Sequence, residues 1–226
     1  MTYRQYRFSF GYGLTPVVKK LMIIIGAVFL LQRMNVELNY NIEVFLGLVP
    51  YWVWTKFYLW QLVTYIFVHG SITHILFNLL AFWMFGGELE NFWGSKEFLF
   101  YFFFCGIGAG ICTVLFSPNQ SIPVIGASGA IWGLLLAFGW LFPNRIIYFN
   151  FLFPIPAKYF VIIFGFLEFF YASRGGTGGG VAHLTHLGGL LFGILYMAYP
   201  VIRRKIRRER YRRKLSQRGP DGGYYH

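Results

Sequence analysis

The chain has 226 residues, of which 57% are hydrophobic, 22% aromatic and only 12% charged. An ordinary soluble domain has about 25% charged residues and roughly 45–50% apolar residues. With 27 Phe, 16 Tyr and 7 Trp, the chain carries more apolar surface than a water-soluble globule of this size can bury. These counts exclude a disordered chain, a collagen-like repeat and a small disulfide-stapled fold. They indicate a protein that lies largely in lipid.

Six apolar segments follow one another along the chain. A membrane-spanning helix needs about 20 mostly apolar residues, so the length allows roughly six to eight crossings. The segments expected to form such helices are residues 17–32, 73–87, 97–116, 126–142, 157–172 and 181–202. We therefore predict an all-α polytopic membrane protein built as a bundle of six transmembrane helices.

A long segment rich in Trp and Tyr separates the first two apolar segments, between residues 34 and 72. Aromatic side chains of this kind favour the headgroup region of a bilayer. We expect this segment to be a structured loop that lies in the membrane interface and contains short amphipathic helices.

Basic residues indicate the orientation of the chain. The formal net charge is +12, and ten of the twenty Lys and Arg residues lie between Arg203 and Arg218. A basic run directly after an apolar segment marks the cytoplasmic end of a membrane helix more often than a nucleic-acid site. We expect a cytoplasmic N-terminal segment (1–16), a membrane domain (17–202) and a basic cytoplasmic tail (203–226) that contacts anionic lipid. No nucleic-acid partner is expected.

Polar residues inside these apolar segments are few and clustered. His74 and Asn78 lie four residues apart in the second segment, Ser128 starts the fourth, and His183 and His186 start the sixth. Polar groups inside a bilayer are costly and suggest a functional site. The second, fourth and sixth segments all run from the outside to the inside, and each carries its polar residues near its beginning. We therefore expect these side chains to lie at a similar depth, toward the outer face.

A serine and a histidine at one depth can act as nucleophile and base. The imidazole takes the hydroxyl proton as the oxygen attacks a carbonyl and later returns it to the leaving amine. The resulting oxyanion needs hydrogen-bond donors. The backbone N–H of Ser128, at a helix N-terminus, and the side chains of His74 and Asn78 are the candidates. Gly126 and Gly129 would let the chain turn tightly beside the nucleophile.

Other interpretations of these motifs stay open at this point. Glycine-rich motifs in membrane helices commonly form close packing faces, as expected for Gly189 and Gly193. The histidines His69, His74, His183 and His186 could bind a metal ion or haem, although the sequence has no His-Glu-x-x-His motif and no cysteine near them. A protein that binds transmembrane helices without cutting them is a further alternative. A small-molecule transporter is disfavoured because no repeat pair is visible.

Three motifs together resemble the rhomboid family of intramembrane serine proteases. The similar region covers about residues 60–193. The first motif is the stretch 69–78, followed by Gly86-Gly87. The second is Gly126-Ala127-Ser128-Gly129, and the third is His-x-x-Gly-x-x-x-Gly, formed by His186, Gly189 and Gly193.

The resemblance implies a serine endopeptidase that hydrolyses peptide bonds within or next to transmembrane segments. Ser128 would be the nucleophile and a histidine of the sixth segment the base, as a dyad without a third carboxylate. His74 and Asn78 would line the oxyanion hole together with Ser128. His186 matches the family's spacing to the two glycines, so we expect His186 rather than His183 to be the base.

The remaining site residues would support this dyad. His69 and His183 would lie beside it, and Trp132, where the family often has a Tyr, would stack on the base. The implied substrates are single-span membrane proteins, and neither a cofactor nor a metal ion is expected. We expect the protein in a bacterial inner (cell) membrane, with both termini in the cytoplasm and the site open toward the outer side.

Overall fold

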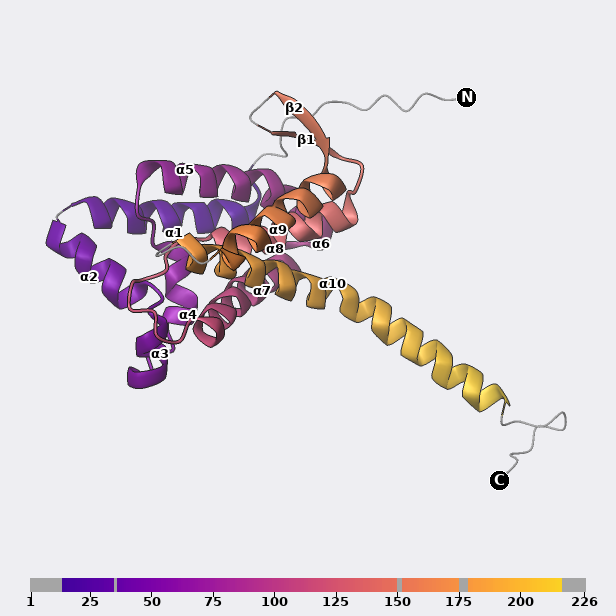
Figure 1. Ribbon diagram of the computed structural model, residues 1–226. Helices are drawn as coiled ribbons and strands as arrows, with labels where there is room; N and C mark the ends of the chain where they lie inside the picture. The colour runs from indigo at the N-terminus through magenta and orange to yellow at the C-terminus, as the bar shows by residue number, and fades with distance from the viewer. Residues whose placement is uncertain (1–13, 35, 150–151, 175–178, 217–226) are drawn as a thin grey trace.

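The computed structural model describes residues 14–34, 36–149, 152–174 and 179–216. The outer parts of the two predicted termini, 1–13 and 217–226, lie outside the described residues. In the described part, helices form a bundle that carries one short β-hairpin, and the last part of α10 extends beyond the other helices (Figure 1).

The elements follow the apolar pattern of the sequence closely. In chain order they are α1 (Pro16–Arg33), α2 (Val36–Leu46), α3 (Pro50–Lys56), α4 (Gln61–Thr64), a 3₁₀ turn (Tyr65–Phe67), α5 (Ile72–Ala81), a π-helical turn (Phe82–Gly86), α6 (Gly87–Trp93), α7 (Ser95–Phe116), α8 (Ser128–Leu141), β1 (Ile146–Phe149), β2 (Phe153–Pro156), α9 (Ala157–Ser173) and α10 (Gly179–Ser216). Each predicted membrane segment therefore coincides with a helix.

The second and sixth predicted segments are longer than expected. The second is a continuous helical run from α5 through the π-helical turn to α6, and it reaches Trp93 rather than residue 87. The sixth, α10, continues to Ser216 rather than ending at residue 202. The basic residues that follow residue 202 mark the end of the apolar surface, but Lys and Arg are good helix formers. The helix therefore does not end where the hydropathy falls.

Length and apolar composition single out candidate membrane-crossing helices among the described residues. Three of its helices are long and apolar enough to cross a membrane: Ile72–Trp93, Ser95–Phe116 and Gly180–Tyr199. α8 is a shorter apolar helix of 14 residues. The protein is thus mostly helical, with long apolar helices as predicted.

Small residues bring α10 close to α8. A Cβ atom added to Gly189 would collide with the carbonyl oxygen of Gly129 on α8. This agrees with the predicted packing face of the sixth segment. One turn earlier on α10, Thr185 is buried and shares a hydrogen bond of 2.7 Å with Thr113 of α7. These contacts hold α10 against its neighbours and fix which of its faces is turned toward α8.

Two buried polar side chains hold α1 and the long segment that follows it. Gln61 bonds parts of that segment to one another, and Glu90 bonds α1 to the rest of the bundle. Gln61 accepts a hydrogen bond from the backbone N–H of Val49 at 2.9 Å and donates one to the carbonyl of Val44 at 3.0 Å. Glu90, which is 3% exposed, accepts hydrogen bonds from the first-turn N–H groups of Val17 and Val18 at 3.0–3.1 Å. These N–H groups have no partners within α1, so Glu90 caps that helix.

Candidate active site

The loop before α8 is held by hydrogen bonds to the segment between α2 and α5. The N–H of Gly126 donates to the carbonyl of Tyr65 at 2.9 Å, and Leu48 and Val124 exchange two backbone hydrogen bonds of 2.8 Å. Gly126 has a φ of +115°, a backbone conformation that favours glycine. This turn places Ser128 as the first residue of α8.

The structure brings Ser128 and His186 together although they are 58 residues apart in sequence. The Nε2 atom of His186 on α10 lies 2.8 Å from the Oγ atom of Ser128 on α8. The ring of Trp132, one turn along α8, packs on the His186 ring with 5.6 Å between ring centroids and 32° between planes. The imidazole is therefore fixed on one side by the hydroxyl and on one face by an indole.

His74 lies on the other side of the serine loop. A Cβ atom on Gly126 would be 2.6 Å from the Nε2 atom of His74, so this ring nitrogen faces the loop that carries Ser128. The Nδ1 atom of His74 is 3.5 Å from the backbone N–H of Gly70 and accepts from it. In that tautomer the proton is on Nε2, which points a donor toward the loop.

Asn78 lies one turn after His74 on α5. Its Nδ2 atom donates to the backbone carbonyl of His74 at 2.8 Å, and the residue is 7% exposed. Within the described residues its Oδ1 atom is buried without a hydrogen-bond partner. The second N–H of the Nδ2 amide leaves one donor beyond the bond to His74.

His69 is a buried support for this region. Its ring lies 5.0 Å from the His74 ring, and its Nε2 atom accepts a hydrogen bond of 3.4 Å from the N–H of Ala127. Burial, and to a smaller extent the neighbouring His74, lowers the pKa of His69 to about 4. His69 is therefore neutral at pH 7, as an acceptor for the Ala127 N–H must be.

The sequence analysis left out one residue of this site, Glu168 on α9. Its Oε2 atom lies 3.0 Å from Nδ1 of His186 and 2.5 Å from Nδ1 of His183. The His183 contact is a hydrogen bond, whereas the His186 contact has the distance of an ion pair without hydrogen-bond alignment. The expected pair of serine and histidine thus has a carboxylate beside it. The sequence does contain a signal for Glu168, because it is the one acidic residue of the fifth apolar segment, and a charge in such a segment is costly.

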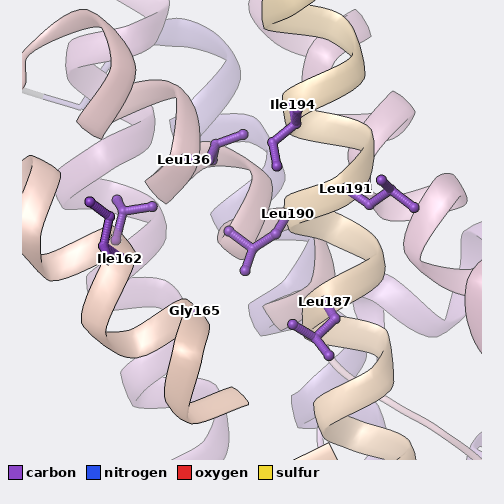
Figure 2. Close-up of a pocket in the computed structure, with 8 residues that line it drawn as sticks. Leu136, Ile162, Gly165, Leu187, Leu190, Leu191 and Ile194 are labelled. Atoms are coloured by element: carbon purple, nitrogen blue, oxygen red, sulfur yellow. The ribbon is translucent and has the colours of Figure 1, made fainter. Parts of the chain in front are cut away.

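An apolar pocket of about 310 Å³ adjoins this cluster between α9 and α10. Figure 2 shows the side chains that line it, which include Leu136 of α8, Ile162 of α9 and Leu187, Leu190 and Ile194 of α10. Leu187 directly follows His186 in the chain. The side chains that line the pocket are all apolar, so the polar groups of this region come from the neighbouring cluster of His183, His186 and Glu168.

Comparison with known proteins gives a consistent result. The profile of the Rhomboid domain matches residues 56–203. The chain is 30% identical over 151 residues to Rhomboid protein 1, mitochondrial, of Saccharomyces cerevisiae. The aligned residues cover 65% of this chain and 43% of the relative. It is 37% identical over 140 residues to Rhomboid protease GluP of Bacillus subtilis, with 62% of this chain and 25% of the relative covered.

A third relative is Rhomboid protease GlpG of Yersinia pseudotuberculosis, 28% identical over 137 residues, with 61% of this chain and 46% of the relative covered. The chain therefore spans about a quarter to a half of the length of these relatives.

Proposed function

Because the chain belongs to the rhomboid family, we propose that it is an intramembrane serine endopeptidase that cuts membrane proteins within or beside their transmembrane segments. The observation that most directly supports this proposal is the 2.8 Å distance between Nε2 of His186 and Oγ of Ser128. It is the distance over which a base takes a proton from a nucleophile.

In the proposed reaction, Oγ of Ser128 attacks the carbonyl carbon of the scissile peptide bond while its proton passes to Nε2 of His186. The carbonyl oxygen gains negative charge, which the backbone N–H of Ser128 and the donors on His74 and Asn78 stabilise. His186 then gives the proton to the leaving amine. A water molecule, deprotonated by the same nitrogen, hydrolyses the acyl-enzyme and restores Ser128.

Glu168 acts on this reaction through His186. A carboxylate near Nδ1 favours the tautomer with its proton on that nitrogen, which leaves a lone pair on Nε2 for the Ser128 proton. It also stabilises the imidazolium that forms when the proton is transferred. We therefore assign Glu168 as a positioning residue, with His183 as its nearer hydrogen-bond partner.

The proposed topology has six crossings with both termini in the cytoplasm, in a bacterial cell membrane. α1 and α9, with 18 and 17 residues, and α8 then join the three longer helices. The 14 residues of α8 span about 21 Å at 1.5 Å per residue, less than the hydrocarbon thickness of about 30 Å. α8 packs against α7, α9 and α10, so it is surrounded by protein and does not need the full thickness of the bilayer.

The proposed substrates are single-span membrane proteins. Their helix must unwind locally, because an intact helix keeps its carbonyl groups in hydrogen bonds. Residues of low helix propensity near the cleavage site would reduce that cost. The basic segment after residue 202 would contact anionic lipid headgroups, and no cofactor takes part in the proposed steps.

Labelling with a fluorophosphonate tests the assignment. We expect covalent modification of Ser128, located by peptide mass spectrometry, that is lost in Ser128→Ala and His186→Ala and largely kept in His183→Ala. Labelling that survives His186→Ala would refute the assigned pair, and loss only in His183→Ala would move the base to His183. A chain that never labels, and whose Ser128→Ala variant keeps its cellular function, would instead be a non-catalytic binder of transmembrane helices.

A further inference from the structure

We propose that Glu168, His183 and His186 form a binding site for a divalent transition metal ion, for which Zn²⁺ is the probe, and that the bound ion inhibits the protease. The geometry of these three side chains supports the metal site. Its inhibitory effect rests on the function proposed above.

Three donor atoms from two helices converge at one point. His183, His186 and Glu168 each offer one donor atom, a ring nitrogen or a carboxylate oxygen, and these three atoms lie within 4.8 Å of one another. The two histidines are three residues apart on α10 and so share a face of that helix, while Glu168 comes from α9. Two imidazoles and one carboxylate are a donor set that Zn²⁺ takes in proteins, with a water as the fourth ligand.

The spacing of the donors is close to that of a bound ion. Metal–ligand bonds of about 2.1 Å in a tetrahedral site put the ligand atoms about 3.4 Å apart. The carboxylate oxygen lies 2.5 Å from His183 Nδ1 and 3.0 Å from His186 Nδ1. A rotation of the Glu168 side chain away from the two rings would bring both of these distances toward the spacing of a bound ion.

Neighbouring side chains hold both imidazoles in place. The ring of Tyr171 stacks on His183 with 5.4 Å between centroids and 26° between planes, and Trp132 packs on His186. Such support keeps ligands oriented before an ion arrives. The side chains of His183 and Glu168 are 30% and 13% exposed, so the site is supported by protein and still reachable from its surroundings.

The binding mode explains why the ion would inhibit. A metal ion takes the lone pair of Nδ1 of His186, so the single proton of the neutral imidazole must move to Nε2. That nitrogen then donates to Ser128 Oγ and no longer accepts its proton. The ion also displaces Glu168 from its role beside Nδ1. Metal binding and general-base catalysis are thus mutually exclusive at His186.

Binding is tested first in a variant that cannot react. We expect the full chain carrying Ser128→Ala, in detergent micelles, to bind one Zn²⁺ in isothermal titration calorimetry. Adding His183→Ala or the isosteric Glu168→Gln should weaken binding at least tenfold, while His226→Ala, which removes a histidine that is not one of the proposed ligands, should not. Absence of binding in Ser128→Ala, or equal binding after both cluster substitutions, would overturn the proposal.

Inhibition is tested on the reactive chain by the rate of Ser128 labelling. Saturating Zn²⁺ should lower this rate at least tenfold, reversibly on chelation, and Mg²⁺, which prefers oxygen ligands, should not. Relative to its own metal-free rate, His183→Ala should need at least tenfold more Zn²⁺ for half inhibition. Equal Zn²⁺ sensitivity in wild type and His183→Ala would assign the inhibition to another site.

The two proposals fail separately. If Ser128 is never labelled but the Ser128→Ala chain binds Zn²⁺ through the cluster, the endopeptidase assignment is refuted and the metal site is supported. If Ser128 labels and Zn²⁺ neither binds nor inhibits, only the metal site falls.

Discussion

Replacing Glu168 by Gln tests whether the carboxylate contributes to the proposed catalysis. The substitution keeps the shape of the side chain and removes the charge beside Nδ1 of His186, 3.0 Å away. Gln can also turn its amide toward the ring, which permits the unproductive tautomer of the imidazole. We expect kcat to fall with little change in KM, because the lost interaction strengthens only when His186 becomes charged in the transition state.

The size of the effect follows from the geometry. A hydrogen bond to a charged group contributes about 1.5–3 kcal/mol, and 1.4 kcal/mol corresponds to a factor of about ten in rate. In serine proteases with an aligned carboxylate, removing its charge lowers kcat by about 10⁴. Glu168 is shared with His183 and is not aligned on His186. We therefore expect an effect at the low end of this energy range, which corresponds to a decrease in kcat of about 10- to 30-fold.

The assay compares cleavage of a transmembrane substrate in proteoliposomes by wild type, Glu168→Gln, Glu168→Asp and Glu168→Ala, all in the presence of a chelator. Glu168→Asp keeps the charge and should recover part of the kcat lost in Glu168→Gln. An unchanged kcat in a folded Glu168→Gln enzyme would refute the positioning role. Equal losses in all three variants, accompanied by lower melting temperatures, would indicate a purely structural role.

Three further substitutions test the surroundings of the site. Gly126→Ala should slow Ser128 labelling at least tenfold, because its φ is +115° and the new Cβ would lie 2.6 Å from His74 Nε2; Gly26→Ala, whose Cβ meets nothing within 4 Å, is the control. Trp132→Ala should lower kcat severalfold and Trp132→Phe much less, since an aromatic ring on the base contributes about 0.5–1.5 kcal/mol. Glu90→Gln should lower the free energy of unfolding by about 1–3 kcal/mol through weaker hydrogen bonds to α1, measured by thermal melting, without changing KM.

Hydropathy predicted the helices well where apolar runs end in turn-forming residues. The third predicted segment, 97–116, differs from α7 (Ser95–Phe116) only at its start, and the fifth, 157–172, differs from α9 (Ala157–Ser173) only at its end. The β1–β2 hairpin was not predicted. Its strands, such as β1 (Ile146–Phe149), are only four residues long, too short for a periodic pattern to stand out.

The residues of the candidate site could be located from sequence because each breaks an apolar run. Ser128, His74, Asn78 and His186 are polar where lipid or packed helix is expected, and their contacts in the structure follow from their position near helix starts. Glu168 breaks its run in the same way. Its significance could not be read from spacing, because its partners come from another helix and the rotation of α9 against α10 is set by packing.

Glu168 also gives the two histidines of α10 different tasks. A carboxylate inside a bilayer is costly unless donors surround it, and His183 supplies the nearer hydrogen bond, at 2.5 Å. With that bond made, Glu168 can remain charged beside His186 without drawing the second ring away from Ser128. The spacing of three residues places both rings on one face of the helix, but only His186 reaches the serine at 2.8 Å. In the proposed mechanism, two imidazoles that look equivalent in sequence thus have different roles: His186 is the base, and His183 supports the carboxylate beside it.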